Sequence, residues 1–200
     1  MNTPNTGPEQ RILDAALDIV NKETISGTRM HLIAEQAQMV QSNIHYYYKT
    51  KNDLMLALQD YIFEVCYEIR RKEKKHSKDN LDSQLDVFIN QKKKQMKNKR
   101  KFDFAEVDFW VQSKTNPEVQ RRFNISYEKW RSEIRGILEI YCPEMDEKYK
   151  EQLPFLMVSM IEGATIQYYI NKDTFDIENY FKICKEMMLT QINHILENKN

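Results

Sequence analysis

Apolar residues recur at steps of three and four along almost the whole chain, and this spacing predicts helices. The first helix is expected to begin near Pro8 and to end around residues 22–24. A short second helix follows with Thr28 as its expected N-cap, and a third covers about residues 41–47. No β-hairpin signal and no internal repeat stands out. The sequence therefore predicts that the chain begins with three helices, of which the second and third are short.

Longer helical segments fill the rest of the chain. Thr50 can cap a long helix whose apolar positions continue to Ile69. Asn116-Pro117-Glu118 combines a capping residue, a first-turn proline and an acidic first turn, and so begins a helix that runs to Tyr141. The remaining segments cover about residues 81–101, 102–112, 146–170 and 174–197. The sequence therefore predicts an all-α fold of about nine helices.

The composition fits a folded helical protein in a reducing compartment. Hydrophobic residues make up 41% of the 200 residues, which is enough for a core, and 4 Gly and 5 Pro are too few for the turns of an all-β chain. The cysteines, Cys66, Cys142 and Cys184, are widely spaced and are expected to be free thiols. Without a secretory signal or an apolar stretch of the roughly 20 residues that a membrane helix needs, the protein is expected to be soluble and cytoplasmic, with no membrane partner.

The charges are unevenly distributed along the chain. The 30 basic and 30 acidic residues cancel, which at first argues against a nucleic-acid binder. Residues 66–101, however, carry 13 basic and 5 acidic side chains, a net charge of +8, and the last half is acidic. The zero total therefore excludes only a uniformly basic protein. We interpret the basic run from Lys92 to Lys101 as a solvated helix end, with an accessory phosphate contact as the alternative.

Three short helices with a tight turn before the third have the layout of a helix-turn-helix DNA reader. In the third helix Ile44 and Tyr48 are expected to face inward. Tyr46 and Tyr47 are expected to be exposed, because three adjacent aromatic residues on a helix cannot all face inward. Glutamine and asparagine can bind adenine edges in the major groove, while tyrosine hydroxyls and lysine suit phosphate oxygens. The residues expected to be exposed for these contacts are Gln41, Ser42, Asn43, His45, Tyr46 and Tyr47, with Lys51 at the start of the next helix.

The stretch from Arg11 to Leu58 resembles the DNA-binding domain of the TetR/AcrR family of bacterial transcriptional regulators. The strongest match is the segment from Ser42 to Leu54, in which Tyr46-Tyr47-Tyr48 precedes Thr50-Lys51 and Asp53-Leu54. The resemblance implies that residues 8–55 form the helix-turn-helix domain. It places Gln41, Ser42, Asn43 and His45 in the major groove, and Tyr46, Tyr47 and Lys51, together with Thr28 and Arg29, on the DNA backbone.

The chain departs from the pattern of this family at three positions. Gln38 and Thr24 each stand where the family usually has glycine. A residue with a side chain at position 38 predicts a strained or altered turn, and Gly27 is a candidate to compensate for Thr24. His45 replaces a common tyrosine, which could change the base preference or make binding sensitive to pH.

The resemblance further implies that residues 56–200 form a helical ligand-binding and dimerisation domain, and this half loosely resembles the BetI-like branch of the family. The candidates for the ligand pocket are aromatic residues and one glutamate, Phe109, Trp110, Phe123, Tyr127, Trp130 and Glu162. Glu162 interrupts an apolar face and could face a cationic ligand, so a small apolar or cationic effector is expected. Alternatively, the aromatic residues are plain core and Glu162 is solvated or hydrogen-bonded at the dimer surface.

The two last predicted helices are apolar over a wide arc, which favours packing against both their own core and a partner. The small residues among them would allow a second helix to approach closely. The candidates for a homodimer interface are Met160, Gly163, Ala164, Gln167, Cys184 and Met188. The alternative is that both helices belong only to the core of one chain.

The predicted function is a ligand-responsive transcriptional regulator, a repressor that binds a palindromic operator as a homodimer and is released by a small molecule. No cofactor, metal site or catalytic residue is predicted. One alternative is a helical sensor or adaptor that does not bind DNA, which the net charge of −1 over residues 1–55 favours. The other is a helical metal-binding enzyme, suggested by the single Glu73-x-x-His76 spacing, although di-iron bundles use that spacing twice.

Overall fold

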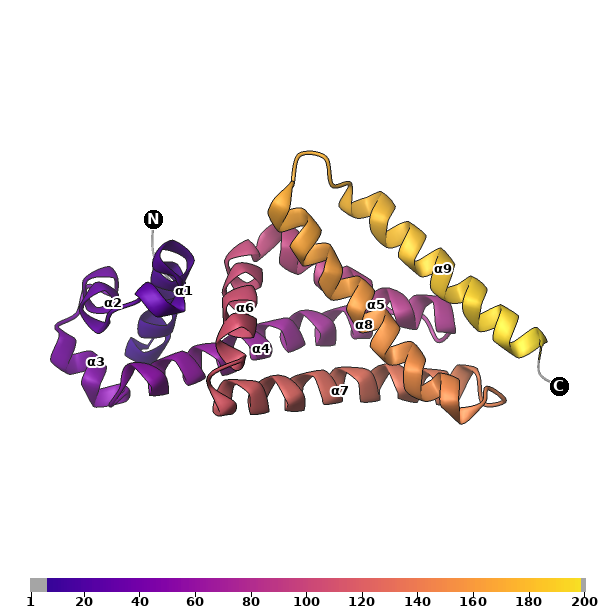
Figure 1. Cartoon of the computed structure of the whole chain (residues 1–200), viewed down its shortest axis with the longest axis horizontal. Helices are drawn as coiled ribbons and strands as arrows, with labels where there is room; N and C mark the ends of the chain where they lie inside the picture. The colour runs from indigo at the N-terminus through magenta and orange to yellow at the C-terminus, as the bar shows by residue number, and fades with distance from the viewer. Residues whose placement is uncertain (1–6, 199–200) are drawn as a thin grey trace. The chain divides into compact units, whose positions relative to one another are not determined.

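The computed structural model describes residues 7–198, and over that range it contains nine α-helices and no strand (Figure 1). This confirms the all-α prediction. The helices are α1 (Pro8–Gly27), α2 (Met30–Gln36), α3 (Gln41–Tyr47), α4 (Lys51–His76), α5 (Leu81–Asn98), α6 (Arg100–Ser113), α7 (Pro117–Tyr141), α8 (Glu147–Ile170) and α9 (Ile177–Glu197). None of these helices is long and apolar enough to cross a membrane.

The chain folds into two compact units. The first consists of the residues up to Val65 together with Lys99–Asn124, and the second of Cys66–Asn98 together with the residues from Ile125 onward. The long helices α4 and α7 therefore each contribute to both units. The functional division that we place between residues 55 and 56 stays a prediction, because the compact units follow packing alone.

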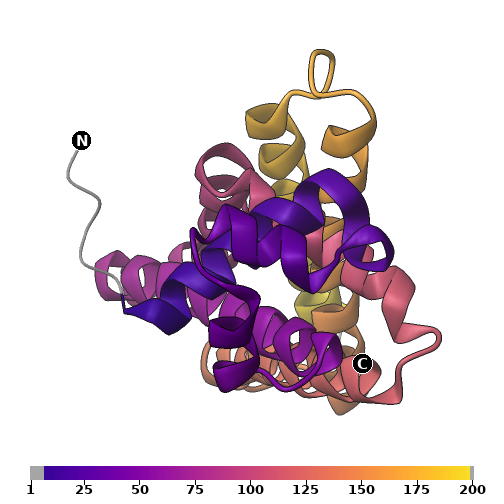
Figure 2. The same ribbon diagram turned by 90° about the vertical axis from the view of Figure 1, so that its left-hand side faces the viewer.

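The first unit has a small apolar core to which each of its short helices contributes. Ile12 of α1, Ile33 of α2, Ile44 of α3 and Leu54 of α4 are fully buried, each with 0% of its surface exposed. Helices of only seven residues, such as α2 and α3, are not stable alone, and the burial of their apolar side chains in this core holds them in place. In Figure 2 the helices α1–α3, coloured indigo to purple, run in different directions.

Two residues of the first unit have a left-handed backbone, and neither is a glycine. Gln38, in the turn between α2 and α3, has a φ of 54°, which confirms the predicted strained turn. Thr24 has a φ of 60° and interrupts the helical geometry of α1, in agreement with a helix end around residues 22–24. The prediction that Gly27 compensates for Thr24 is wrong, because no glycine among the described residues has a positive φ.

The predicted N-cap of α2 is also wrong. Arg29 occupies the N-cap position in an extended conformation, and no side chain caps this helix. Thr28 is instead fully buried, and its hydroxyl donates a hydrogen bond to the carbonyl of Thr24 at 2.7 Å. Thr28 therefore ties the left-handed residue to the start of α2, which the local sequence pattern did not reveal.

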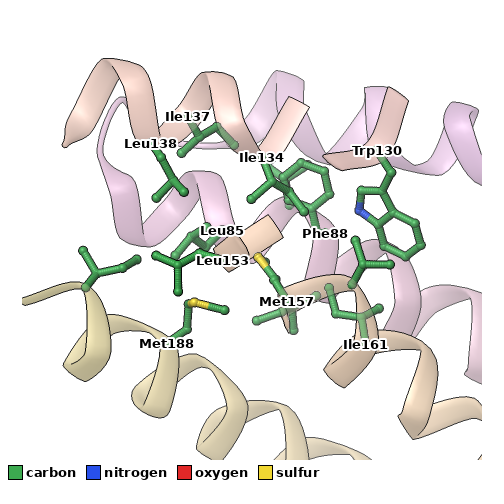
Figure 3. Packing of buried hydrophobic residues seen from close by; sticks show 14 of the residues in the cluster. Leu85, Phe88, Trp130, Ile134, Ile137, Leu138, Leu153, Met157, Ile161 and Met188 are labelled. Carbon is green, nitrogen blue, oxygen red and sulfur yellow. The ribbon is translucent and has the colours of Figure 1, made fainter. Parts of the chain in front are cut away.

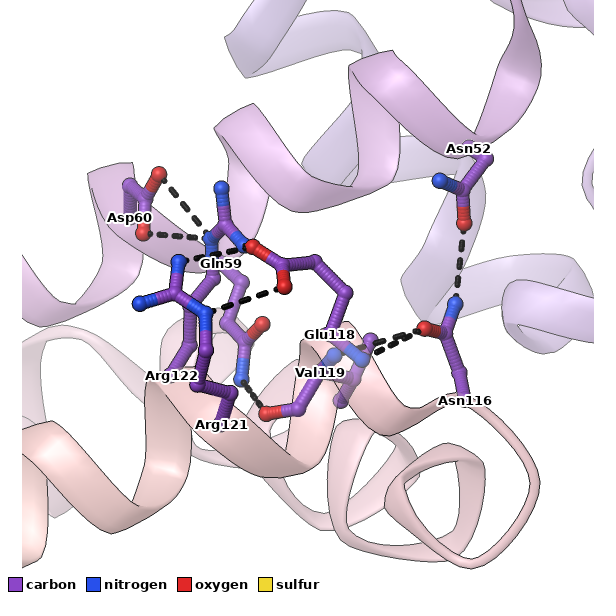
Figure 4. Close-up of polar contacts among 8 residues, drawn as sticks. All are labelled: Asn52, Gln59, Asp60, Asn116, Glu118, Val119, Arg121 and Arg122. Carbon is purple, nitrogen blue, oxygen red and sulfur yellow. Dashed lines mark hydrogen bonds and ion pairs between the residues drawn. The ribbon is translucent and has the colours of Figure 1, made fainter.

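Two other predicted caps are confirmed. Thr50 Oγ1 accepts a hydrogen bond from the Asp53 amide at 3.1 Å, and Asp53 Oδ2 accepts one from the Thr50 amide at 2.9 Å, so α4 begins with a capping box. Asn116 Oδ1 accepts the amides of Glu118 and Val119 at the start of α7 (Figure 4). These caps satisfy amides that helix starts leave without partners.

The second unit has an apolar core built by α5, α7, α8 and α9 (Figure 3). Cys142 and Cys184 are buried free thiols, and Cys66 is partly buried, as predicted. Residues that meet in the core include Phe88 of α5, Ile134 of α7, Met157 of α8 and Met188 of α9. No group of three or more His, Cys, Asp or Glu side chains placed to hold a metal occurs in the described part of the chain.

The basic run that begins at Lys92 is not a solvated helix end throughout. Lys92 is 1% exposed and its ammonium lies 3.1 Å from the carboxylate of the buried Glu162. Lys93 and Lys97 both pair with Glu178 at 2.5 Å. Further along the run, Lys94 pairs with Glu73 and Lys101 with Asp18. Internal carboxylates therefore neutralise much of the positive charge that the sequence concentrates here.

Candidate nucleic-acid interface

The inner side of α3 confirms the sequence prediction. Ile44 is fully buried, and Tyr48, which follows the helix, is 7% exposed. The Tyr48 hydroxyl donates to the carboxylate of Glu9 at 3.2 Å. Burial, followed by the charge of Glu9, raises the pKa of Tyr48 above its ordinary range. Tyr48 therefore remains neutral and joins the end of α3 to the start of α1.

The outer side of α3 carries polar and aromatic side chains. Gln41, Ser42 and Asn43 are exposed, and Tyr46 and Tyr47 keep 76% and 39% of their surfaces exposed. The rings of Tyr46 and Tyr47 pack edge to face with centroids 5.2 Å apart. An edge-to-face contact of this kind is favourable, and it leaves both rings on the exposed side of α3.

His45 lies partly buried and is engaged on both sides of its ring. Its Nε2 lies 3.3 Å from the Gln41 amide nitrogen, and its Nδ1 lies 3.2 Å from the carbonyl of Lys49. When Nδ1 carries the proton, the ring donates to Lys49 and accepts from Gln41. His45 then orients the amide of Gln41, one of the candidate base contacts.

An open groove of about 560 Å³ runs beside the exposed face of α3. Its lining residues are Pro8, Arg11, Gln38, Met39, Val40, Asn43, Tyr46 and Tyr47. Arg11 is a further candidate for this interface, one that the sequence pattern did not indicate. It donates to the carbonyl of Ala37 at 2.8 Å and so holds the turn before α3. The signal that could have revealed it is its position as the lone basic residue in the first turns of α1.

The two candidate cations outside α3 meet at the C-terminal end of α1. Arg29 donates to the carbonyls of Ser26, Gly27 and Thr28 at 2.8, 3.2 and 3.1 Å. Lys51 donates to the same Ser26 carbonyl at 3.4 Å. Burial lowers the pKa of Lys51, and the positive charge of Arg29 lowers it further. Thr28, also predicted to contact the DNA backbone, does not present its side chain at the surface.

Two family models match the chain one after the other. Residues 12–58 match the bacterial regulatory proteins of the tetR family, and residues 100–193 match the C-terminal region of BetI-type transcriptional repressors. The chain belongs to the TetR family of bacterial transcriptional regulators. The helices α1–α3 are thus the DNA-binding helix-turn-helix of a TetR-family member. Because this family consists of regulators rather than enzymes, the alternative of a helical metal-binding enzyme is wrong.

Individual relatives agree with this placement. The chain is 22% identical over 197 residues to the HTH-type transcriptional regulator BetI of Pseudomonas fluorescens, with 92% of each chain covered. It is 40% identical over 57 residues to an uncharacterised HTH-type regulator of Xanthobacter autotrophicus, a match that spans 28% of that protein. The first of these relatives therefore extends the TetR-family likeness over nearly the whole chain.

Solved structures show the same fold. A transcriptional regulator of Pseudomonas aeruginosa superposes with a TM-score of 0.81 at 16% identity, covering 96% of both chains. A regulator of Saccharomonospora viridis, solved in complex with choline, gives a TM-score of 0.77 at 18% identity, covering 93% of this chain and 95% of that one. At these identities the likeness shows a shared fold and nothing more.

The candidate pocket residues are divided between the two units. Phe109, Trp110 and Phe123 belong to the first, and the rings of Trp110 and Phe123 have centroids 6.5 Å apart. Tyr127, Trp130 and Glu162 belong to the second, where the rings of Tyr127 and Trp130 are 6.0 Å apart. Phe109, Phe123 and Trp130 are buried, while Trp110 and Tyr127 are partly buried.

Two of these residues are engaged within the second unit. Glu162 is ion-paired with Lys92, so it is neither solvated nor at the surface of the unit. Trp130 packs against the guanidinium of Arg70, which lies 4.9 Å from its centroid and 5.0 Å from those of Tyr67 and Phe88. The aromatic faces of this cluster therefore already hold a cation of the chain itself.

Half of the candidate dimer residues are buried within the second unit. Ala164, Cys184 and Met188 are 0%, 8% and 4% exposed, Met160 and Gly163 are partly buried, and Gln167 is exposed. The large apolar residues that α8 and α9 do expose are Phe155, Leu156, Ile166, Tyr169, Ile170, Ile183 and Met187. The exposed stripe therefore lies beside the predicted one on the same two helices.

Proposed function

We propose that this TetR-family protein represses transcription as a cytoplasmic homodimer that binds a palindromic operator and is released by a small effector. The outward face of α3 carries this proposal. It presents amide and hydroxyl groups for bases and two exposed tyrosines for the DNA backbone, all beside an open groove. The operator sequence would be read by Gln41, Ser42, Asn43 and His45.

The affinity would come from contacts with phosphates. Tyr46 and Tyr47 offer hydroxyls at the groove, and Arg11 adds a positive charge to its wall. Arg29 and Lys51 supply two more cations near the start of α2. Thr28 is left out of this set because its hydroxyl is buried and already donates to Thr24.

The homodimer would form through the exposed apolar faces of α8 and α9. Leu156, Ile166 and Ile170 follow each other along α8, with the small residues Ser159 and Gly163 between them. Ile183 and Met187 continue the apolar surface on α9. Large apolar side chains at this spacing on two neighbouring helices are typical of a four-helix interface. Such a dimer would let two copies of α3 enter successive major grooves.

The effector would be small and either apolar or cationic. This rests on relatives, since the family match of residues 100–193 is to BetI-type repressors and one solved structure of the same fold holds choline. Binding would shift the population toward dimers whose copies of α3 are wrongly spaced for the operator.

Operator binding can be tested with DNA selected from a random pool by the purified protein. The expected result is salt-dependent retardation that is lost in Tyr47→Ala, with the helical signal in circular dichroism unchanged. Gln36→Ala, an exposed position on α2 outside the groove, is the matched control and should bind like the wild type. Failure of the folded protein to select any DNA would favour a sensor or adaptor that does not bind DNA.

A further inference from the structure

In the first unit, α6 is joined to the C-terminal part of α1 by polar contacts. Asn21 donates to the carbonyl of Lys101 at 2.9 Å, and Gln112 donates to the hydroxyl of Ser26 at 3.1 Å. Between these two, the carboxylate of Asp108 accepts a hydrogen bond from the backbone amide of Ile25. An acidic side chain of α6 therefore binds the main chain directly after Thr24.

The amide of Ile25 needs a partner from outside its own helix. Thr24 has a φ of 60° and a ψ of 168°, so the regular hydrogen-bond ladder of α1 is broken at this point. Ile25 itself is only 6% exposed. A buried backbone amide without a partner costs roughly 1–3 kcal/mol, and Asp108 removes that cost with a charged acceptor.

The segment that Asp108 anchors also holds two cations proposed to contact DNA. The carbonyl of Ser26, the next residue, accepts hydrogen bonds from Arg29 at 2.8 Å and from Lys51 at 3.4 Å. Arg29 adds bonds to the carbonyls of Gly27 and Thr28. The backbone carbonyls of residues 26–28 therefore bind both positive charges.

The charge of Asp108 acts on the same pair of cations. Burial and the nearby Arg29 lower the pKa of Lys51, whereas the negative charge of Asp108 raises it. Asp108 therefore opposes the mutual repulsion of Arg29 and Lys51, in addition to holding their backbone.

We propose that Asp108 is a positioning residue of the DNA interface. By binding the Ile25 amide it fixes residues 25–28 and so places Arg29 and Lys51 against operator phosphates. This inference rests on the proposed function, because it concerns how the two cations reach DNA. Loss of a carboxylate by itself would favour DNA binding through its charge, so the inference predicts an effect of opposite sign.

The test compares Asp108→Ala, Asp108→Asn and the control Glu35→Ala on an operator fragment at several salt concentrations. Glu35 is an exposed acidic residue of the same unit, so it controls for the change in charge. Asp108→Ala is expected to bind about tenfold more weakly, and the slope of log K against log salt should become shallower by about 1–2 for each lost pair of contacts. Asp108→Asn keeps an acceptor and should keep most of the slope, and Glu35→Ala should bind at least as tightly as the wild type.

A double-mutant cycle separates positioning from loss of structure. In an Arg29→Ala/Lys51→Ala background, Asp108→Ala should cost no further affinity, because the cations through which it acts are gone. A general weakening of the fold would still reduce binding in that background. Equal affinity and salt slope for wild type and folded Asp108→Ala, or a full additional loss in the cycle, would overturn the inference.

Hydrogen exchange of the Ile25 amide tests the anchor without any DNA. The amide should exchange slowly in the wild type and in Asp108→Asn, and faster in Asp108→Ala, while amides in the second unit keep their rates. Unchanged exchange in Asp108→Ala would overturn the inference even if the protein binds DNA. If the wild type binds no DNA at all, the proposed function fails, and the exchange result shows separately whether Asp108 holds this segment.

Discussion

At the scale of the residue, Gln38 illustrates how the turn before α3 retains a side chain in a conformation that suits glycine. Its φ of 54° brings Cβ close to neighbouring backbone, at a cost of roughly 1–2 kcal/mol for an L-residue. The carbonyl of Ala37 next to it is held by Arg11, and Ile44 anchors α3 in the core. The surrounding contacts therefore impose a backbone conformation that Gln38 does not favour on its own.

Gln38→Gly is expected to stabilise the protein by about 0.5–1 kcal/mol. Glycine adopts a positive φ without strain, and this gain exceeds the entropy that glycine adds to the unfolded chain. The measurement is unfolding by urea, followed by circular dichroism. Glu35→Gly, at an exposed helical position three residues earlier, should destabilise by about 1 kcal/mol. A loss of stability in Gln38→Gly would contradict the strained turn.

The environment of Tyr61 predicts that the folded protein loses stability at alkaline pH. Burial, followed by the charge of Asp14 and the hydrogen bond to its carboxylate at 3.1 Å, raises the pKa of Tyr61 to about 12. The unfolded chain loses this proton near pH 10 while the folded one keeps it, so stability is present below pH 10 and is lost as pH rises toward 12. Tyr61→Phe should therefore show a shallower decline in melting temperature between pH 10 and pH 12. Identical pH profiles for wild type and variant would contradict this.

At the scale of the element, α9 shows why neighbouring residues on one helix need different roles. Met187 is 60% exposed and Met188 is 4% exposed, although both stand in the same apolar run. Met188 packs into the core of the second unit, whereas Met187 lies on the face left open. A helix that is apolar around most of its circumference can thus serve two surfaces at once.

Met187→Lys should give a folded monomer, and Met188→Lys should unfold the second unit. A lysine at the exposed position places a charge in the proposed dimer interface, while one at the buried position must desolvate its ammonium in the core. Light scattering on a sizing column gives the oligomeric state, and circular dichroism gives the fold. A Met187→Lys variant that remains dimeric would exclude this face of α9 as the interface.

The helices themselves could be predicted because periodicity and caps are local. Thr50 and Asn116 cap the helices that the sequence assigned to them. The role of Thr28 could not be predicted from the sequence, because it depends on the left-handed backbone four residues earlier. Lys92 escaped because its partner Glu162 lies 70 positions away in sequence.

In the candidate site, too, local features could be predicted from the sequence and contacts between distant residues could not. The inward positions of α3 follow from its own pattern, and Ile44 and Tyr48 are buried as expected. The choice of Cys184 and Met188 as dimer residues was not supported by burial, because an all-round apolar helix gives no signal for which face packs inside. The roles of Arg11 and Asp108 could not be predicted, because both side chains bind backbone atoms of distant residues, and the pattern of side chains gives no information on such contacts.

At the scale of the whole molecule, the distribution of charge determines how operator binding should respond to salt. The chain has no net charge, and its basic middle is largely paired internally, as Lys93 is with Glu178 and Lys94 with Glu73. In the helix-turn-helix the cations proposed for phosphate are Arg11, Arg29 and Lys51. Electrostatic attraction of DNA over long distances is therefore expected to be weak.

The slope of log K against log salt for a dimer should be no steeper than about −5, because three cations in each of two subunits displace about six counterions. Lys93→Ala/Lys94→Ala should leave that slope unchanged, since both lysines already face carboxylates. Fluorescence anisotropy of an operator fragment between low and moderate salt gives the value. A slope near −10, or one that flattens in the double variant, would place the basic middle on the DNA.

The burial of Lys92 makes it a natural reporter on the opening of the second unit. Its side chain is 1% exposed and its ammonium is ion-paired, so an amine-reactive label cannot reach it while the unit is closed. Lys182, whose side chain is 71% exposed, would react at once and serve as the internal standard. The ratio of the two labelled peptides in a mass spectrum thus measures how often the second unit opens. A ligand that stabilises the closed unit would slow the labelling of Lys92, so the assay detects such a ligand before the ligand has been identified.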